Sequence, residues 1–182
     1  MHRRRYPFNA IIIGTASGLV GTVLMTQFQN LSKKLTDRWE KPQTTPEESQ
    51  KSDEEKEDST VIAAAKIAEA AGHKLPTDMK RKAGNLVHYS FGSTLGCGYG
   101  LMRESGPKSF RRMDPLLAGT MYGTSVFLSA HEVAVPALKL SPNPLEEPLG
   151  DHVSHLLSHV VYGVGTALTY GLFRKLWRLA TK

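Results

Sequence analysis

The sequence has a single cysteine, and long stretches of it contain no Asp, Glu, Lys or Arg. One cysteine, Cys97, excludes both an intramolecular disulfide and a zinc site built from cysteines. Three stretches contain none of these charged residues, and a fourth stretch, Pro115 to Leu138, contains a single acidic residue, Glu132. Soluble helices of such length usually keep a charged face for water, so the pattern argues against a soluble helical protein. The fully uncharged stretches are Tyr6 to Ser32, Ala83 to Met102 and His152 to Phe173.

Each of these stretches is long enough to cross a bilayer. An α-helix rises about 1.5 Å per residue, so about 20 residues cross a hydrocarbon core of about 30 Å. We therefore predict an all-α integral membrane protein, a single domain of residues 1–182 that forms a four-transmembrane-helix bundle. The spans are expected at about residues 9–28, 83–102, 115–138 and 152–173.

The region between the first two expected spans changes character twice. Residues 42–58 contain no apolar residue except proline, and their many acids predict a long, charged, disordered linker. Residues 59–72 have Ala, Ile and Val at helical spacing, with Ser59 or Thr60 as a possible N-cap and Gly72 as terminator. They predict a short amphipathic helix, either on the membrane surface or against the bundle.

Basic residues indicate the orientation. Four spans would put both termini on one face with the turn between spans two and three, and that face has eleven Lys and Arg against Glu104 and Asp114. Because basic flanks stay in the cytoplasm, both termini are expected to be cytoplasmic. Lys80, Arg81 and Lys82 beside the second span count against this orientation. The net charge of +6 lies at the span flanks, so it does not indicate a nucleic-acid partner.

Glycine is concentrated in the expected spans, often at a spacing of four residues. In lipid, small residues allow helix backbones to approach closely, and this is the main mechanism of helix association. The repeated GxxxG pattern therefore predicts a compact bundle, with any remaining glycine face left for a partner. The predicted helix-packing residues are Gly14, Gly18, Gly92, Gly96, Gly100, Gly119, Gly123 and Gly163.

Polar side chains inside the expected spans form the candidate functional site. Their positions fall toward the non-cytoplasmic half of the bundle, where ionisable groups are costly and usually pair with each other. Three interpretations stay open: a hydrogen-bonded structural cluster, a metal or haem site with His88, His131 and His159 as candidate ligands, and a proton or ion relay. The predicted intramembrane polar cluster comprises His88, His131, Glu132, His155 and His159.

Several short strings of the sequence carry a family resemblance. They are the basic N-terminus before a Gly-rich span, Val87 to Gly92 leading to Tyr99-Gly100, and His159 to Gly163. Gly119 and the pair His131-Glu132 before Pro136 and Leu140-Ser141-Pro142 belong to the same set. In these strings the chain resembles the YagU-like family of bacterial inner-membrane proteins of unknown function. The resemblance implies a multi-pass protein of the bacterial inner (cytoplasmic) membrane and supplies no catalytic mechanism.

From these observations we expect a non-enzymatic integral membrane protein that acts as a structural or accessory component through its glycine-rich helix faces. Its partners would be the lipid bilayer and a membrane protein or further copies of itself. One alternative is a small transporter or proton-handling protein that uses Glu132 and the intramembrane histidines. Another is a haem- or metal-binding subunit of a membrane redox complex. No cofactor is required by the leading interpretation.

Overall fold

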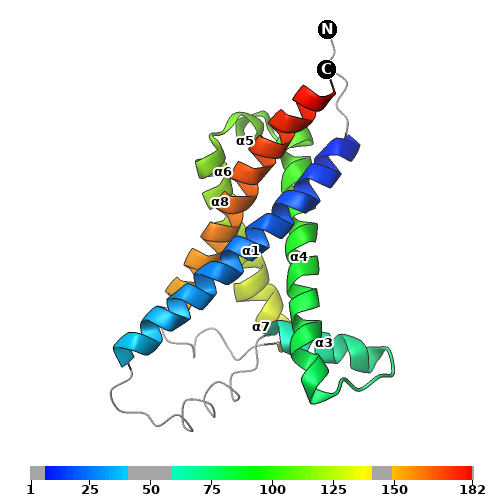
Figure 1. Ribbon diagram of the computed structural model, residues 1–182, viewed down its shortest axis with the longest axis vertical. Helices are drawn as coiled ribbons and strands as arrows, with labels where there is room; N and C mark the ends of the chain where they lie inside the picture. The colour runs from blue at the N-terminus through cyan, green and yellow to red at the C-terminus, as the bar shows by residue number, and fades with distance from the viewer. Residues whose placement is uncertain (1–6, 41–58, 141–148, 182) are drawn as a thin grey trace.

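The computed structural model describes residues 7–40, 59–140 and 149–181, and every regular element in these ranges is helical, which confirms the all-α prediction (Figure 1). The predicted linker at residues 42–58 lies outside the described residues. The long helices are α1 (Pro7–Glu40), α4 (Thr77–Ser105) and α8 (Leu149–Ala180). The short ones are α3 (Ser59–Ala70) and α5 (Lys108–Arg112). Helix α6 (Pro115–Val126), the π-helix η1 (Phe127–Ala134) and α7 (Val135–Ala137) follow one another directly.

Helix α1 lies across α4 and α8, and α6 packs on the other side of α8. The start of α1, helix α5 and the end of α8 lie at one end of the molecule, here called the α5 end (Figure 1). The end of α1, helix α3, the start of α4, helix α7 and the start of α8 lie at the opposite end, the α3 end. Successive long segments therefore run in alternating directions between the two ends.

Glycines lie where these helices touch. A Cβ added to Gly96 on α4 would lie 2.5 Å from the carbonyl oxygen of Gly14 and 2.6 Å from the backbone nitrogen of Gly18, both on α1. Between α6 and α8, a Cβ on Gly119 would lie 2.7 Å from the carbonyl oxygen of Gly163. Real Cβ atoms essentially never come within 3.0 Å of such atoms, so these backbone contacts require glycine.

Tyrosines fill the centre of the molecule. Tyr99 is fully buried, and its ring meets those of Tyr122 and Tyr170 edge-on, at centroid distances of 5.1 and 5.8 Å. The Tyr122 hydroxyl donates to the carbonyl of Leu95 at 2.6 Å, and the Tyr162 hydroxyl donates to that of Gly92 at 2.7 Å. Large rings thus span the gaps that glycine leaves, and the hydroxyls of Tyr122, Tyr162 and Tyr170 are bonded to the backbone of α4.

Two of the described helices are long and apolar enough to cross a membrane: α1 over Phe8–Thr36, and α8 over Leu149–Ala180. The prediction of four spans is therefore supported for the first and fourth spans only, by length and composition. Helix α4 covers the second predicted span, but glycines, tyrosines and hydroxyl residues lower its mean hydropathy. The third predicted span is divided, because the helix changes to π geometry at Phe127.

Candidate functional site

The helix that contains the predicted pair His131-Glu132 changes its hydrogen-bond register there. The N–H of Val135 donates to the carbonyl of Ala130, five residues back, as in a π-helix. Pro136 supplies the physical reason, because it has no N–H to donate to the carbonyl of Glu132 four residues earlier, and its ring would clash with that carbonyl. Such π-helical turns are rare and occur frequently at functional sites.

Glu132 faces the first turns of α8. Its Oε1 lies 3.2 Å from Nδ1 of His152, and the two side chains are 22% and 23% exposed. An ionised carboxylate only accepts hydrogen bonds, so His152 donates from Nδ1 when Glu132 is charged. With a charged Glu132, the contact is an ion pair when the imidazole is protonated and a charge-assisted hydrogen bond when the imidazole is neutral.

The next histidines along α8 are linked through the backbone. Nδ1 of His159 lies 2.8 Å from the carbonyl oxygen of His155. A carbonyl cannot donate, so Nδ1 carries the proton, and Nε2 is the acceptor in the neutral ring. The His159 ring also meets Phe127 edge-on, with 5.6 Å between centroids. This fixed tautomer makes Nε2 of His159 the atom able to take up a proton.

His88 on α4 contacts α1. Its Nε2 lies 3.4 Å from Oγ1 of Thr26. The Thr26 hydroxyl already donates to the carbonyl of Thr22 at 2.9 Å, so in this contact the threonine oxygen accepts and the imidazole donates. His88 thereby connects α4 to α1, whereas Glu132 and His152 connect η1 to α8.

The predicted polar cluster is therefore distributed over several contacts at the α3 half of the molecule. Within the described residues, no group of three or more His, Cys, Asp or Glu side chains is placed to hold a metal ion. The side chain of His131 lies outside the described residues, so the candidate ligand set of His88, His131 and His159 stays a prediction.

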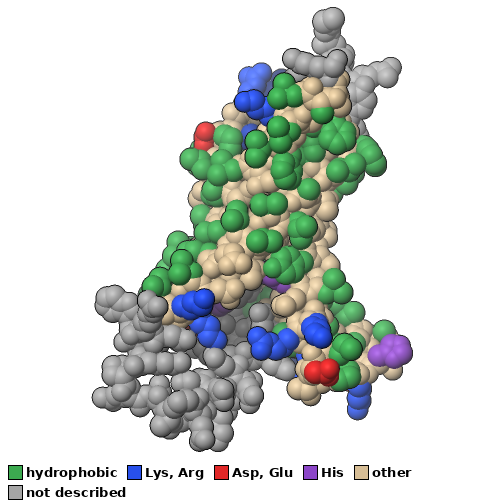
Figure 2. Space-filling view, viewed as in Figure 1, with side chains coloured by type: hydrophobic (Ala, Val, Ile, Leu, Met, Phe, Trp, Pro, Cys, Tyr) green, Lys and Arg blue, Asp and Glu red, His purple; other side chains and the backbone are tan. Residues whose placement is uncertain are grey.

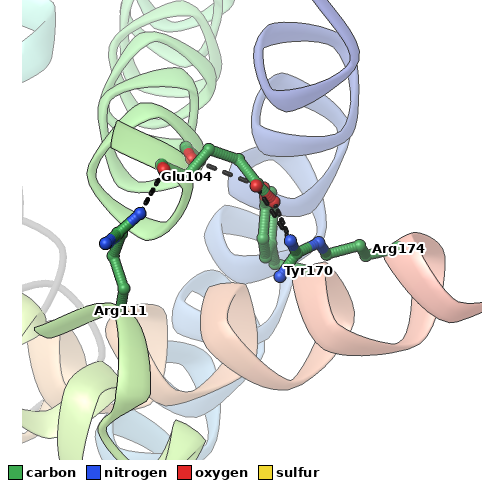
Figure 3. Close-up of polar contacts among 5 residues, drawn as sticks. Glu104, Arg111, Tyr170 and Arg174 are labelled. Carbon is green, nitrogen blue, oxygen red and sulfur yellow. Dashed lines mark hydrogen bonds and ion pairs between the residues drawn. The ribbon is translucent and has the colours of Figure 1, made fainter. Parts of the chain in front are cut away.

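A second polar cluster lies at the α5 end, and sequence analysis missed it (Figure 3). Nη2 of Arg174 lies 2.6 and 2.8 Å from the two carboxylate oxygens of Glu104, and the Tyr170 hydroxyl donates to Oε1 at 3.1 Å. Arg111 donates to the carbonyl of Glu104 at 3.3 Å. The available signal was the spacing of Tyr170 and Arg174, four residues apart on one helix face, at the same end as Glu104.

The two clusters lie among described elements that are all helical, and α1 and α8 are long and apolar enough to cross a membrane. The chain belongs to the family described as a protein of unknown function (DUF1440), whose model matches residues 42–168. The match begins after α1 and ends within α8, so it includes Glu104, Glu132 and His152 but not Arg174. No curated protein and no solved structure matches the chain.

Proposed function

We propose that the protein is a non-enzymatic integral membrane protein, a structural or accessory component whose four helical segments cross the bilayer and pack through glycine. The observation that carries this proposal is the distribution of polarity. Large apolar side chains such as Leu86 and Leu116 are 69% and 55% exposed, whereas Ser17 and Thr166 are fully buried.

This distribution suits lipid better than water. Figure 2 shows hydrophobic and uncharged side chains along the middle of the visible face, with Lys and Arg gathered at both ends. Many exposed apolar side chains on one face are unfavourable in water but are matched by acyl chains. Between helices in lipid, small residues and buried hydroxyls supply the contacts that hydrophobic burial supplies in water. The low hydropathy of α4 fits this proposal, because Gly92, Gly96 and Gly100 face α1 rather than lipid.

The proposed location is the bacterial inner membrane with both termini in the cytoplasm. Its support is the resemblance to the YagU-like family and the basic character of the α5 end, which would then be cytoplasmic. At this end only Glu104 and Asp114 are acidic among the described residues. The basic residues there are Arg103, Lys108, Arg111, Arg112, Arg174, Lys175 and Arg178.

Membrane topology can be tested with the cysteine chemistry of the chain. In a Cys97→Ala background, single cysteines at Lys108 and at Lys74 report the two ends through a membrane-impermeant maleimide. We expect labelling of intact cells at position 74 only, and labelling of both positions in opened membranes. Labelling of both positions in intact, sealed cells would contradict four crossings.

The accessory role predicts a stoichiometric membrane partner. Native mass spectrometry after extraction in mild detergent measures the mass of the complex directly. A defined complex larger than one chain supports the proposal, whereas a single chain at every detergent concentration, with unchanged folding, contradicts it.

A second candidate function, proton handling, is favoured by the contact between Glu132 and His152. Both groups can exchange protons, and Nε2 of His159, about two turns further along α8, is an acceptor in the neutral ring. The test is proton flux into liposomes that contain the wild-type chain, Glu132→Gln or, as a matched control, Glu104→Gln. Flux that is lost only in Glu132→Gln supports proton handling, and wild-type flux equal to empty liposomes excludes it.

A further inference from the structure

A shallow groove separates the first turns of α1 from the last turns of α8. Its volume is about 310 Å³, which lies at the lower limit of the range typical of small-ligand pockets. Its lining residues are all apolar: Ile12, Ile13, Ala16, Phe173, Leu176, Trp177 and Ala180. An occupant therefore contributes a hydrocarbon surface and no hydrogen-bonding group.

The size of the groove disfavours a second copy of the chain as the occupant. Stable protein–protein interfaces bury about 800 Å² on each partner, from about 20 to 30 residues. Seven residues from two helices supply much less than this. A single hydrocarbon chain fits the groove better than another protein surface does.

The charged side chains beside the groove indicate which headgroup the hydrocarbon chain would carry. Lys175 and Arg178 are exposed on the same turns of α8 as Leu176 and Trp177. The neighbouring Arg174 is bonded to Glu104 at the same end. Lys and Arg side chains extend along apolar surface to reach the headgroup level, where they attract anionic lipids.

We propose that the groove between α1 and α8 holds an acyl chain of an anionic membrane phospholipid, whose headgroup is bound by Lys175 and Arg178. This inference rests on the proposed membrane insertion. Each cation near an anionic headgroup is expected to favour binding by roughly fivefold, so the pair gives a clear preference over a zwitterionic lipid.

Trp177 reports the occupancy of the groove directly. The only other tryptophan is Trp39, so Trp39→Phe leaves Trp177 as the single indole fluorophore. This variant is reconstituted in phosphatidylcholine vesicles that contain one-fifth brominated phosphatidylglycerol or one-fifth brominated phosphatidylcholine. Bromine quenches tryptophan only at contact. We expect at least twofold stronger quenching by the brominated anionic lipid at the same mole fraction.

Charge variants connect this preference to the proposed headgroup site. In the Trp39→Phe background, Lys175→Gln with Arg178→Gln is expected to remove the excess quenching. The matched control, Lys33→Gln with Lys34→Gln, removes the same charge from α1 at the opposite end and is expected to retain it. Circular dichroism of each variant in the same vesicles verifies its helical fold.

The outcomes separate the lipid site from membrane insertion. Equal quenching by both brominated lipids overturns the lipid site and leaves insertion intact. Excess quenching by the anionic lipid that survives in the Lys175/Arg178 variant has the same consequence. Quenching that falls as the protein-to-lipid ratio rises also overturns the site, because it indicates that a second copy covers the groove. Absence of quenching by either lipid, with the fold retained, overturns insertion itself.

Discussion

Each end of the molecule places one glutamate against helix α8, but the two contacts differ in kind. At the α5 end, Glu104 receives short contacts from Arg174 to both carboxylate oxygens and a hydrogen bond from Tyr170. At the α3 end, Oε1 of Glu132 lies 3.2 Å from Nδ1 of His152. Arginine stays charged at every physiological pH, whereas histidine is charged only when protonated.

The helix packing around the two glutamate contacts also differs. Toward the α5 end, the backbones of α1 and α4 touch at Gly14, Gly96 and Gly100, and the Tyr99 ring is fully enclosed. Toward the α3 end, the helix register is altered by Pro136, and histidines take the place of tyrosines in the inter-helix contacts. The comparison teaches that the α5 end pairs its glutamate with a permanent cation, whereas the α3 end uses imidazoles in its contacts between helices.

The largest expected effect tests the tight packing between α1 and α4. In Gly96→Leu, the new side chain would meet the backbone of Gly14 and Gly18, so the helices must separate, at a cost of about 3 kcal/mol or more. Gly171→Leu is the matched control, because nothing lies within 4 Å of an added Cβ there. Thermal unfolding in one detergent compares them. Equal melting temperatures would show that the glycine contacts do not hold the helices together.

The next effect concerns the ion pair at the α5 end. Arg174→Gln removes the permanent cation from Glu104, and we expect the free energy of unfolding to fall by about 1–2 kcal/mol. This is less than the cost of breaking a fully buried pair, because Arg174 is partly exposed to solvent. Lys175→Gln, an equal charge change at an exposed neighbour, should cost less than about 0.5 kcal/mol. The measurement is again the unfolding midpoint. A Lys175 variant as unstable as the Arg174 variant would indicate a general charge effect rather than this pair.

Helical structure could be predicted from the sequence because its signals are local. The described residues of the uncharged stretches and the Ala-rich segment after Ser59 fall within helices, and Gly72 follows the end of α3 with a positive φ of 80°. Glycine spacing indicated that backbones would approach closely. Spacing within one helix cannot identify the opposite helix, so the contact of Gly14 with Gly96, across more than 80 residues, needed the structure.

The polar contacts could be predicted only in part, for the same reason. Glu132 was expected near a histidine, but the partner in the structure is His152, because the π-helix turns Glu132 toward the first turns of α8. Pro136 was visible in the sequence, yet a proline near a helix end is common and does not by itself predict a register change. Glu104 and Arg174 lie 70 residues apart, so their pairing depends on how α4 packs beside α8.

A smaller effect is expected where α3 meets the end of α7. Nζ of Lys66 donates to the carbonyls of Leu138 and Lys139 at 2.8 and 2.9 Å, which satisfies carbonyls at the helix C-terminus with a cation. Lys66→Gln should lower the free energy of unfolding by about 0.5–1 kcal/mol. It should also speed hydrogen exchange in α7 while exchange in α5 stays unchanged, with Lys74→Gln as control. Faster exchange at both ends would mean that the two halves do not open independently.

The smallest expected effect is at Glu132, and it decides whether the two glutamates truly differ. In Glu132→Gln the amide oxygen still accepts a hydrogen bond from His152, so we expect a loss below about 0.5 kcal/mol. Glu104→Gln loses its charge opposite Arg174 and should cost more, up to about 2 kcal/mol. Unfolding midpoints of the two variants under identical conditions give the difference. If Glu132→Gln lowers the unfolding midpoint more than Glu104→Gln does, the charge of Glu132 stabilises the α3 end. The contrast between the ion pair at the α5 end and the histidine contact at the α3 end then fails.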